Sequence, residues 1–453
     1  MHRGWKSLIS LAMASFLLAG CGSQTGQEQN NAAVSQTKNG EMEEKTAGQK
    51  DDGEGGTEAA QEQITLTFSY WGDKNELAVK KALIEDFEAA HPNIKIEATF
   101  TDGVSYHTKL QTFFSSNSAP DVVSIASDIM YDFAEEGMFE DLTPYMERDQ
   151  VADQWMEGSM DPFTKGGKIY AAPYVSKVFA IAYNKNIFDE AGIAYPEDGW
   201  TEEEFVETAK ALTSGEGVNK IYGTKLGDTN SIRDLYGVEA LYDVTNKVMK
   251  AQGNESFEHA ITLWTDLIRD GYSPSALEVD SIGGGFETGK FATSYCATWD
   301  MNSWESLIGD SFDWDVVTLP VNEEYGAWTY PAYIDGMAIS ATSEKKEAAW
   351  EFIKWNTLSE ESERKVSQLG VPVLKEYVES EEYLNDYPDS YTVKYDKGIF
   401  VAMMARVAGQ ESLGVWAEIN DELTKQYNAV SLGETTVEEA IAALQVKGDQ
   451  VLQ

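Results

Sequence analysis

Apolar and polar residues alternate over residues 64–71, which predicts a β-strand with one buried face. A short polar turn follows this strand. Val79, Leu83 and Phe87 then recur every four residues, as on the buried face of an amphipathic helix. Pro92 ends the pattern, because the residue before a proline is disfavoured in helical conformation. The folded part of the chain is therefore expected to begin with a strand and a helix.

Two further strands are predicted soon afterwards. Alternation returns at residues 94–100, and a short, mostly apolar run occupies residues 121–125 directly after Pro120. Strands separated by helices at this spacing form βαβ units, whose strands run parallel. We therefore predict an α/β fold with a mostly parallel sheet.

The stretch at residues 168–185, KIYAAPYVSKVFAIAYNK, is apolar on both sides of the polar pair Ser176 and Lys177. No polar face returns every three or four residues, so we predict two buried strands with a break at that pair, not a helix. Pro173 has no N–H to donate and is expected at a strand end or a bulge. We interpret this stretch as a crossing of the chain from one lobe to another.

A second crossing is predicted at residues 328–340, which are again mostly apolar. Helix starts further along the chain are indicated by capping residues. These are Thr201 with Glu204, Ser343, and Thr436 with Glu439.

Residues 1–20 have the order of a secretory signal, with basic residues, an apolar segment and then small residues. The segment ends in Leu-Ala-Gly before Cys21, which resembles a bacterial lipobox, in which the cysteine is lipidated and becomes the new N-terminus. An ordinary cleaved signal with an incidental cysteine is the alternative. Residues 21–63 are polar and acidic with little to bury, which predicts a disordered tether.

Composition narrows the class of protein. A chain of 453 residues is too long for one ordinary core, so two lobes are expected. The formal net charge of −43 argues against nucleic acid or an anionic membrane surface as a direct partner. Cys21 and Cys296 are too few for a disulfide framework, and Cys296 is expected to be a small buried residue.

The sequence offers little apparatus for catalysis or cofactor binding. It contains no HExxH, GxSxG or CxxC motif, and its four histidines are scattered. Residues 284–290 resemble a phosphate loop, but Phe291 stands where a Ser or Thr must reach Mg²⁺, so no cofactor or metal is predicted. A secreted glycoside hydrolase stays an alternative, since 77 acidic residues can supply its two carboxylates. A surface adhesin is a third interpretation.

Several motifs, taken in order, carry a family resemblance. The chain resembles the extracellular solute-binding proteins of ABC importers, in particular the sugar-binding group that includes maltose-binding protein. The resemblance covers most of residues 64–452. The motifs are YWGDK at 70–74, PDVV at 120–123, EEGMFEDLTPY at 135–145, the stretch at 168–185, FETGKFATSYCATWD at 286–300 and AISATSEKKEAAWEFIKW at 338–355.

The resemblance implies a two-lobed periplasmic-binding-protein fold, with a hinge and a ligand cleft between the lobes that closes on the ligand. One lobe would comprise residues 64–164 and 328–375, and the other residues 165–327 and 376–453. It implies a non-enzymatic monomer that binds a carbohydrate, expected to be an oligosaccharide, and delivers it to the permease subunits of an ABC transporter. With the lipobox, it implies an extracytoplasmic protein anchored to the bacterial cell membrane through Cys21.

The resemblance also implies positions for the site. Asp73 and Lys74 match a cleft-facing pair, and Asp128 matches a second cleft carboxylate. Trp299 falls where the family stacks an aromatic ring on a sugar, and Trp416 lies near another such position. From the residues alone, Asp73 is equally suited to capping the next helix. For Trp299, packing in the core is the alternative role.

Sugar recognition needs flat apolar rings against the C–H faces of the pyranose, and carboxylates or amides for its hydroxyls. Further candidates are chosen on this chemistry, at strand ends and near the two crossings. They are Trp71, Tyr174, Asp300, Tyr330 and Tyr333. Arg406, in an otherwise apolar stretch, is a further candidate. Arg406 has a buried salt bridge as its alternative role.

Overall fold

A computed structural model describes the chain from residue 63 to residue 452, apart from residues 73, 230, 233–240, 244–245, 323, 326–331, 386, 388–394 and 405–415. The expected signal, the lipidation site at Cys21 and all but the last residue of the expected tether lie outside the described residues. Residues 60–453 form one compact unit. In the described part of the chain, no helix is long and apolar enough to cross a membrane.

The main sheet is mixed in direction, so the prediction of a mostly parallel sheet is wrong. Its order is β2-β1-β3-β12-β6-β10-β7, with β11 and β13 also paired to β6. Strands β2 and β3 lie parallel to β1, and β7 parallel to β10, whereas β12 and β6 run antiparallel to their neighbours. The bounds are β1 Ile64–Trp71, β2 Ile94–Thr101, β3 Val122–Ala126, β6 Ala172–Asn184, β7 Tyr222–Lys225, β10 Phe291–Ala297, β11 Trp314–Val317, β12 Ala332–Ile339 and β13 Val371–Pro372.

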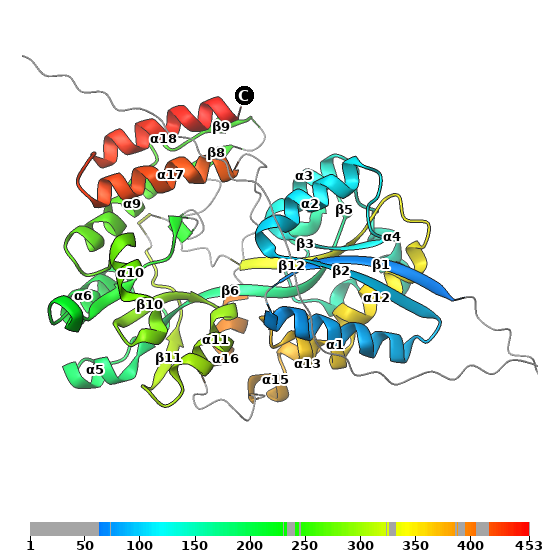
Figure 1. The fold of residues 1–453 in the computed structure, drawn as a ribbon, viewed down its shortest axis with the longest axis horizontal. Helices are drawn as coiled ribbons and strands as arrows, with labels where there is room; N and C mark the ends of the chain where they lie inside the picture. Colours follow the sequence, from blue (N-terminus) through cyan, green and yellow to red (C-terminus); the bar gives the residue numbers. More distant parts are fainter. Residues whose placement is uncertain are drawn as a thin grey trace, which may run out of the picture. The chain divides into compact units, whose positions relative to one another are not determined.

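Strand β6 is one continuous strand of 13 buried residues, which corrects the predicted break at Ser176 and Lys177. Up to Val178 it pairs with β12, and from Phe179 onward with β10 (Figure 1). The register shifts beside Pro173, which confirms the expected bulge. This strand therefore joins the two halves of the main sheet, one on each side of the crossing.

Helices lie between the strands, and two capping predictions are confirmed. The pairs Thr201–Glu204 and Thr436–Glu439 form capping boxes. Ser343 is not a helix cap, because its hydroxyl accepts the N–H of Lys345 and donates to Asp121.

The helices are α1 Lys74–Ala90, α2 Gly103–Ser115, α3 Ser127–Glu135, α4 Thr143–Asp149, α5 Lys185–Ala191, α6 Glu202–Leu212, α9 Glu255–Arg269, α10 Ala276–Ile282, α11 Thr298–Ile308, α12 Lys346–Leu358, α13 Glu360–Val366, α14 Lys375–Val378, α15 Glu381–Asn385, α16 Lys397–Met404, α17 Trp416–Ser431 and α18 Val437–Val451. Short hairpins are formed by β4 Thr164–Lys165 with β5 Lys168–Ile169, and by β8 Tyr242–Asp243 with β9 Val248–Met249.

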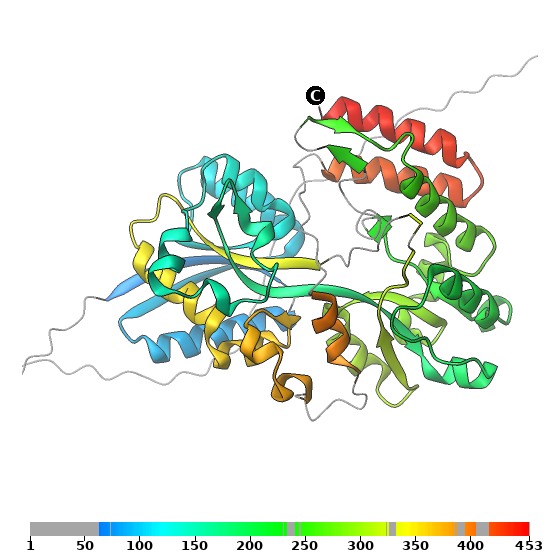
Figure 2. The same cartoon turned by 180° about the vertical axis from the view of Figure 1, so that it is seen from behind.

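Two sets of buried residues flank the crossing. Around β1, β3 and β12, helices α1 and α12 cover one face of the sheet and α2 and α3 the other (Figure 1). Around β10 and β11, the core contains residues of α6, α9, α11 and α17, with α17 packed along α18 (Figure 2). Cys296 is buried in this second core, as expected. The hydrophobic burial in each set stabilises its own part of the sheet.

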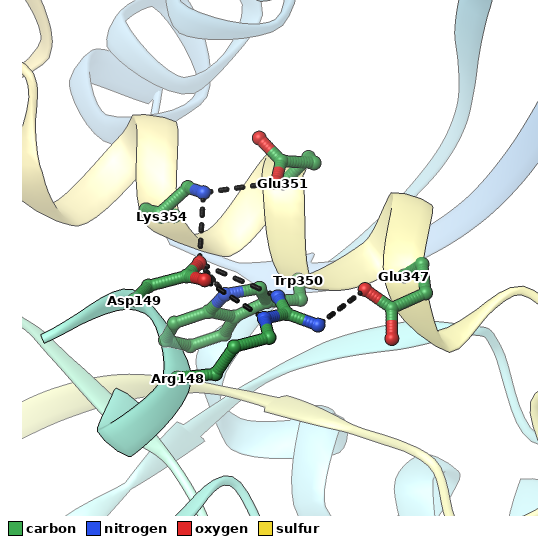
Figure 3. Close-up of polar contacts among 6 residues, drawn as sticks. All are labelled: Arg148, Asp149, Glu347, Trp350, Glu351 and Lys354. Carbon is green, nitrogen blue, oxygen red and sulfur yellow. Dashed lines mark hydrogen bonds and ion pairs between the residues drawn. The ribbon is translucent and has the colours of Figure 1, made fainter. Parts of the chain in front are cut away.

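Helices α4 and α12 are joined by a network of charged and polar groups (Figure 3). The carboxylate of Asp149 accepts hydrogen bonds from Arg148 at 2.8 Å, the indole N–H of Trp350 at 2.8 Å and Lys354 at 2.9 Å. Arg148 also pairs with Glu347 at 2.9 Å. The bonds from Arg148 and Trp350 hold the pKa of Asp149 well below its usual range. The network fixes α4 against α12, next to the sheet.

Candidate functional site

A cavity of about 440 Å³ lies where several strands end. Trp71 is the last residue of β1, and Asp128 follows β3 in the first turn of α3. On the other side, Trp299 and Asp300 follow β10 in the first turn of α11. In α/β folds, ligands bind at the carboxyl ends of the strands, and this cavity has that position.

Aromatic rings form two sides of the cavity. Trp71 packs against Tyr106, with ring centroids 4.9 Å apart. Trp299 remains 43 % exposed and meets Phe179 edge to face at 5.2 Å. Tyr333 of β12 contacts the same ring at 5.8 Å. Phe179 stands where β6 changes partner from β12 to β10, so the crossing strand itself positions Trp299 and Tyr333.

Besides Glu76 of α1, carboxylates line the cavity from α3, α11 and β12. In Asp128, the Oδ1 atom is buried and has no hydrogen-bond partner among the described residues. The Asp300 carboxylate accepts the backbone N–H of Ala297 at 2.9 Å, and burial raises its pKa. Asp335 of β12 is buried, and burial raises its pKa to about 6 in spite of the positive charges of Lys177 and Lys80. These groups can accept hydrogen bonds from a bound molecule.

The basic groups at the cavity are held by other parts of the protein. Lys177 of β6 donates to Glu76 at 3.0 Å and to the carbonyl of Leu369 at 2.7 Å. Lys80 is buried with its ammonium 5.2 Å from the ring centroid of Trp71, and burial lowers its pKa. Burial also lowers the pKa of His107, against the effect of Asp128. These interactions preorganise the floor of the cavity.

The structure brings five of the expected site residues together around this cavity. They are Trp71, Asp128, Trp299, Asp300 and Tyr333. Tyr174 does not line it, because its ring is buried beneath Lys80 at 5.2 Å. Asp73, Tyr330 and Arg406 lie outside the described residues, as do the side chains of Lys74 and Trp416.

Sequence reasoning missed several lining residues. They are Glu76, His107, Lys177, Ser303, Asp335 and Gln368. For Lys177 and Asp335 a signal existed, since each is a lone charge in an otherwise apolar strand, and buried charges are rarely kept without a role or a partner. The other four lie on or beside helices, where polar residues are ordinary.

The cavity combines exposed aromatic faces with hydrogen-bond acceptors, which suits a molecule with apolar faces and polar edges. Among the described residues, no group of three His, Cys, Asp or Glu side chains is placed to hold a metal ion. Two lobes joined by a shared strand, with a cavity at the strand ends, define a binding protein of the hinged two-lobed class.

Comparison with known protein families leads to the same class. Residues 71–362 match the family described as bacterial extracellular solute-binding protein, and the chain belongs to this family. A binding protein of Brucella abortus is 24% identical over 384 residues, covering 83% of this chain and 89% of the relative. A maltotriose-binding protein of Pyrococcus abyssi is 23% identical over 320 residues, covering 69% of this chain and 67% of the relative.

Solved structures share the fold. An ABC substrate-binding protein of Listeria monocytogenes, in complex with cycloalternan, superposes with a TM-score of 0.72 at 22% identity. The superposition covers 86% of this chain and 99% of the other. The expected two-lobed periplasmic-binding-protein fold is thereby confirmed.

Proposed function

We propose that this protein is the substrate-binding component of an ABC transporter, and that it captures an oligosaccharide in the cleft for delivery to the membrane permease. The observation that carries the proposal is that Trp71, Trp299 and Asp128 line one cavity, with the Oδ1 atom of Asp128 lacking a hydrogen-bond partner among the described residues. The rings suit the C–H faces of a pyranose, and the carboxylate suits its hydroxyls. The sugars named for the Pyrococcus and Listeria relatives, maltotriose and cycloalternan, support an oligosaccharide.

The same proposal gives the bounds of the lobes: residues 64–164 with 328–375 form one, and residues 165–327 with 376–453 form the other. The two lobes close on the ligand, and the protein acts as a monomer. Family membership favours binding without turnover over the glycoside hydrolase and adhesin interpretations.

Calorimetry with malto-, cello- and manno-oligosaccharides tests the proposal. At least one series is expected to bind with a Kd in the micromolar range or tighter, and to raise the melting temperature, since it binds only the folded state. Small-angle scattering should show a smaller radius of gyration at saturation, as the lobes close. Absence of binding by every series, or hydrolysis of a bound sugar, would contradict this function.

We further propose that the protein is extracytoplasmic and held at the membrane by lipid on Cys21, behind a tether at residues 21–63. Replacing Cys21 by Ser is expected to move most of the protein from the membrane fraction to the soluble extracytoplasmic fraction, because a stable membrane anchor then no longer exists. Fractionation and immunoblotting measure the change, with Ser23→Ala as a control that stays with the membrane. Unchanged membrane association of Cys21→Ser would rule out this anchor.

A further inference from the structure

Negative charge dominates the lining of the cleft. Acidic side chains come from α1, α3, α11 and β12, whereas the described lining residues include one lysine and one histidine. The acidic residues are Glu76, Asp128, Asp300 and Asp335, and the basic ones are Lys177 and His107.

The positive groups are already engaged. Lys177 is 6 % exposed and divides its ammonium between Glu76 and the carbonyl of Leu369. The histidine, His107, is partly buried, and burial lowers its pKa, so that it is neutral at pH 7. Lys80 lies behind the aromatic rings and does not line the cavity. An acidic group on a ligand would therefore meet no available cation among the described lining residues.

The negative groups are only partly compensated. The buried Oδ1 atom of Asp128 has no hydrogen-bond partner among the described residues, and this side chain faces the cavity. Near Asp300, the charge of Lys225 is opposed by that of Glu287. Lys177 and Lys80 act on Asp335, but Glu76 and Asp128 oppose them. The local field thus favours a positive group on the ligand, and the exposed ring of Trp299 favours it too.

We propose that the cleft selects glycans by charge, binding amine-bearing sugars more tightly than neutral ones and excluding acidic ones, with Asp128 as the contacting group for the amine. This inference rests on the proposed function, because it names the kind of glycan that the same cleft takes. A hydroxyl and an ammonium can both donate a hydrogen bond to the Asp128 carboxylate, but the ammonium adds a direct attraction between opposite charges. A carboxylate on the sugar would instead stand beside like charges, which repel it.

The test uses maltotriose, cellotriose and mannotriose, each in its hydroxyl, 2-amino and 6-carboxyl form, with binding measured by calorimetry at pH 7 and low salt. On any backbone that binds, the amino form is expected to bind about tenfold tighter than the hydroxyl form, and the carboxyl form at least about tenfold weaker. Raising the ionic strength should reduce the amino preference. Equal affinities of the three forms, or tighter binding of the carboxyl form, would overturn the inference.

Two variants test whether Asp128 is responsible for the preference for amino sugars. In Asp128→Asn the ratio of amino to hydroxyl affinity should fall clearly below that of the wild type, because the amide removes the contacting charge and keeps the shape. Glu136→Gln is the matched control at the exposed end of the same helix, and it should keep the ratio of the wild type. A ratio unchanged in Asp128→Asn overturns the role of this residue. Failure of every form on every backbone contradicts the proposed function itself, and is thus distinct from binding without a charge preference.

Discussion

Replacing Trp299 by alanine is expected to weaken oligosaccharide binding about thirtyfold or more, since loss of a central aromatic anchor costs on the order of 2 kcal/mol. The free energy of unfolding should change by less than about 1.5 kcal/mol, because the indole is 43 % exposed and packs edge to face on Phe179. Calorimetry and urea unfolding on the same variant measure the two effects.

Tyr195→Ala is a suitable control for this experiment. Tyr195 is 39 % exposed and packs on Tyr183, away from the cleft lining. Its truncation should leave sugar affinity unchanged. If Trp299→Ala instead loses about 3–5 kcal/mol of stability and binds sugar normally, the ring serves packing and not recognition.

Local elements were predictable because their causes are local. The alternation of apolar and polar residues in β1 and the four-residue spacing of apolar residues in α1 involve only residues that are close in sequence. The same is true of the capping boxes at Thr201 and Thr436. Trp299 could be placed at a strand end for the same reason, since an apolar run stops just before it. Such signals need no knowledge of the rest of the chain.

The errors arise where a residue's partner is distant in sequence. Ser176 and Lys177 look like a break, but Lys177 is neutralised by Glu76 and bound by the carbonyl of Leu369, 101 and 192 residues away. With its charge satisfied, the strand continues through both residues. The antiparallel return of β12 between β3 and β6 is a long-range pairing of the same kind. Neither the contacts of Lys177 nor the pairing of β12 can be recognised from the residues next to them in sequence.

Tyr174 shows that strand register decides whether a side chain faces the cleft or the core. It lies in β6 at the point where the pairing with β12 shifts, and its ring turns under Lys80 into the first core. A shift of one residue exchanges the two faces of a strand. An aromatic residue near a crossing therefore cannot be assigned to the cleft until the bulge is known.

Glu363 of α13 fixes another passage of the chain between the two cores. Its side chain is fully buried, and one carboxylate oxygen accepts the backbone N–H groups of Val373 and Leu374, both at 2.9 Å. Val373 packs in the core around β1, and Leu374 in the core around β10. The strand just before them, β13, pairs with β6. The carboxyl group thus holds the backbone where it passes from one core to the other.

Glu363→Ala is expected to lower the free energy of unfolding by roughly 2–4 kcal/mol, because it leaves two buried N–H groups without a partner. Glu361→Ala, an exposed position on the same helix, should change it by less than about 0.5 kcal/mol. Burial raises the pKa of Glu363 from 4.5 to about 8, so the folded protein keeps this proton while the unfolded chain has lost it. The stabilisation from Glu363 is then fully present below pH 4.5 and is lost as pH rises through about 8.

Glu363→Gln isolates that proton, since the amide oxygen still accepts both N–H groups but cannot ionise. Relative to this variant, the wild type should lose stability by up to a few kcal/mol between pH 5 and pH 8.5. Urea unfolding of both proteins at pH 5, 7 and 8.5 measures the difference. Parallel pH profiles for the two proteins would show that Glu363 is ionised in the folded state, with its charge compensated inside the passage between the cores.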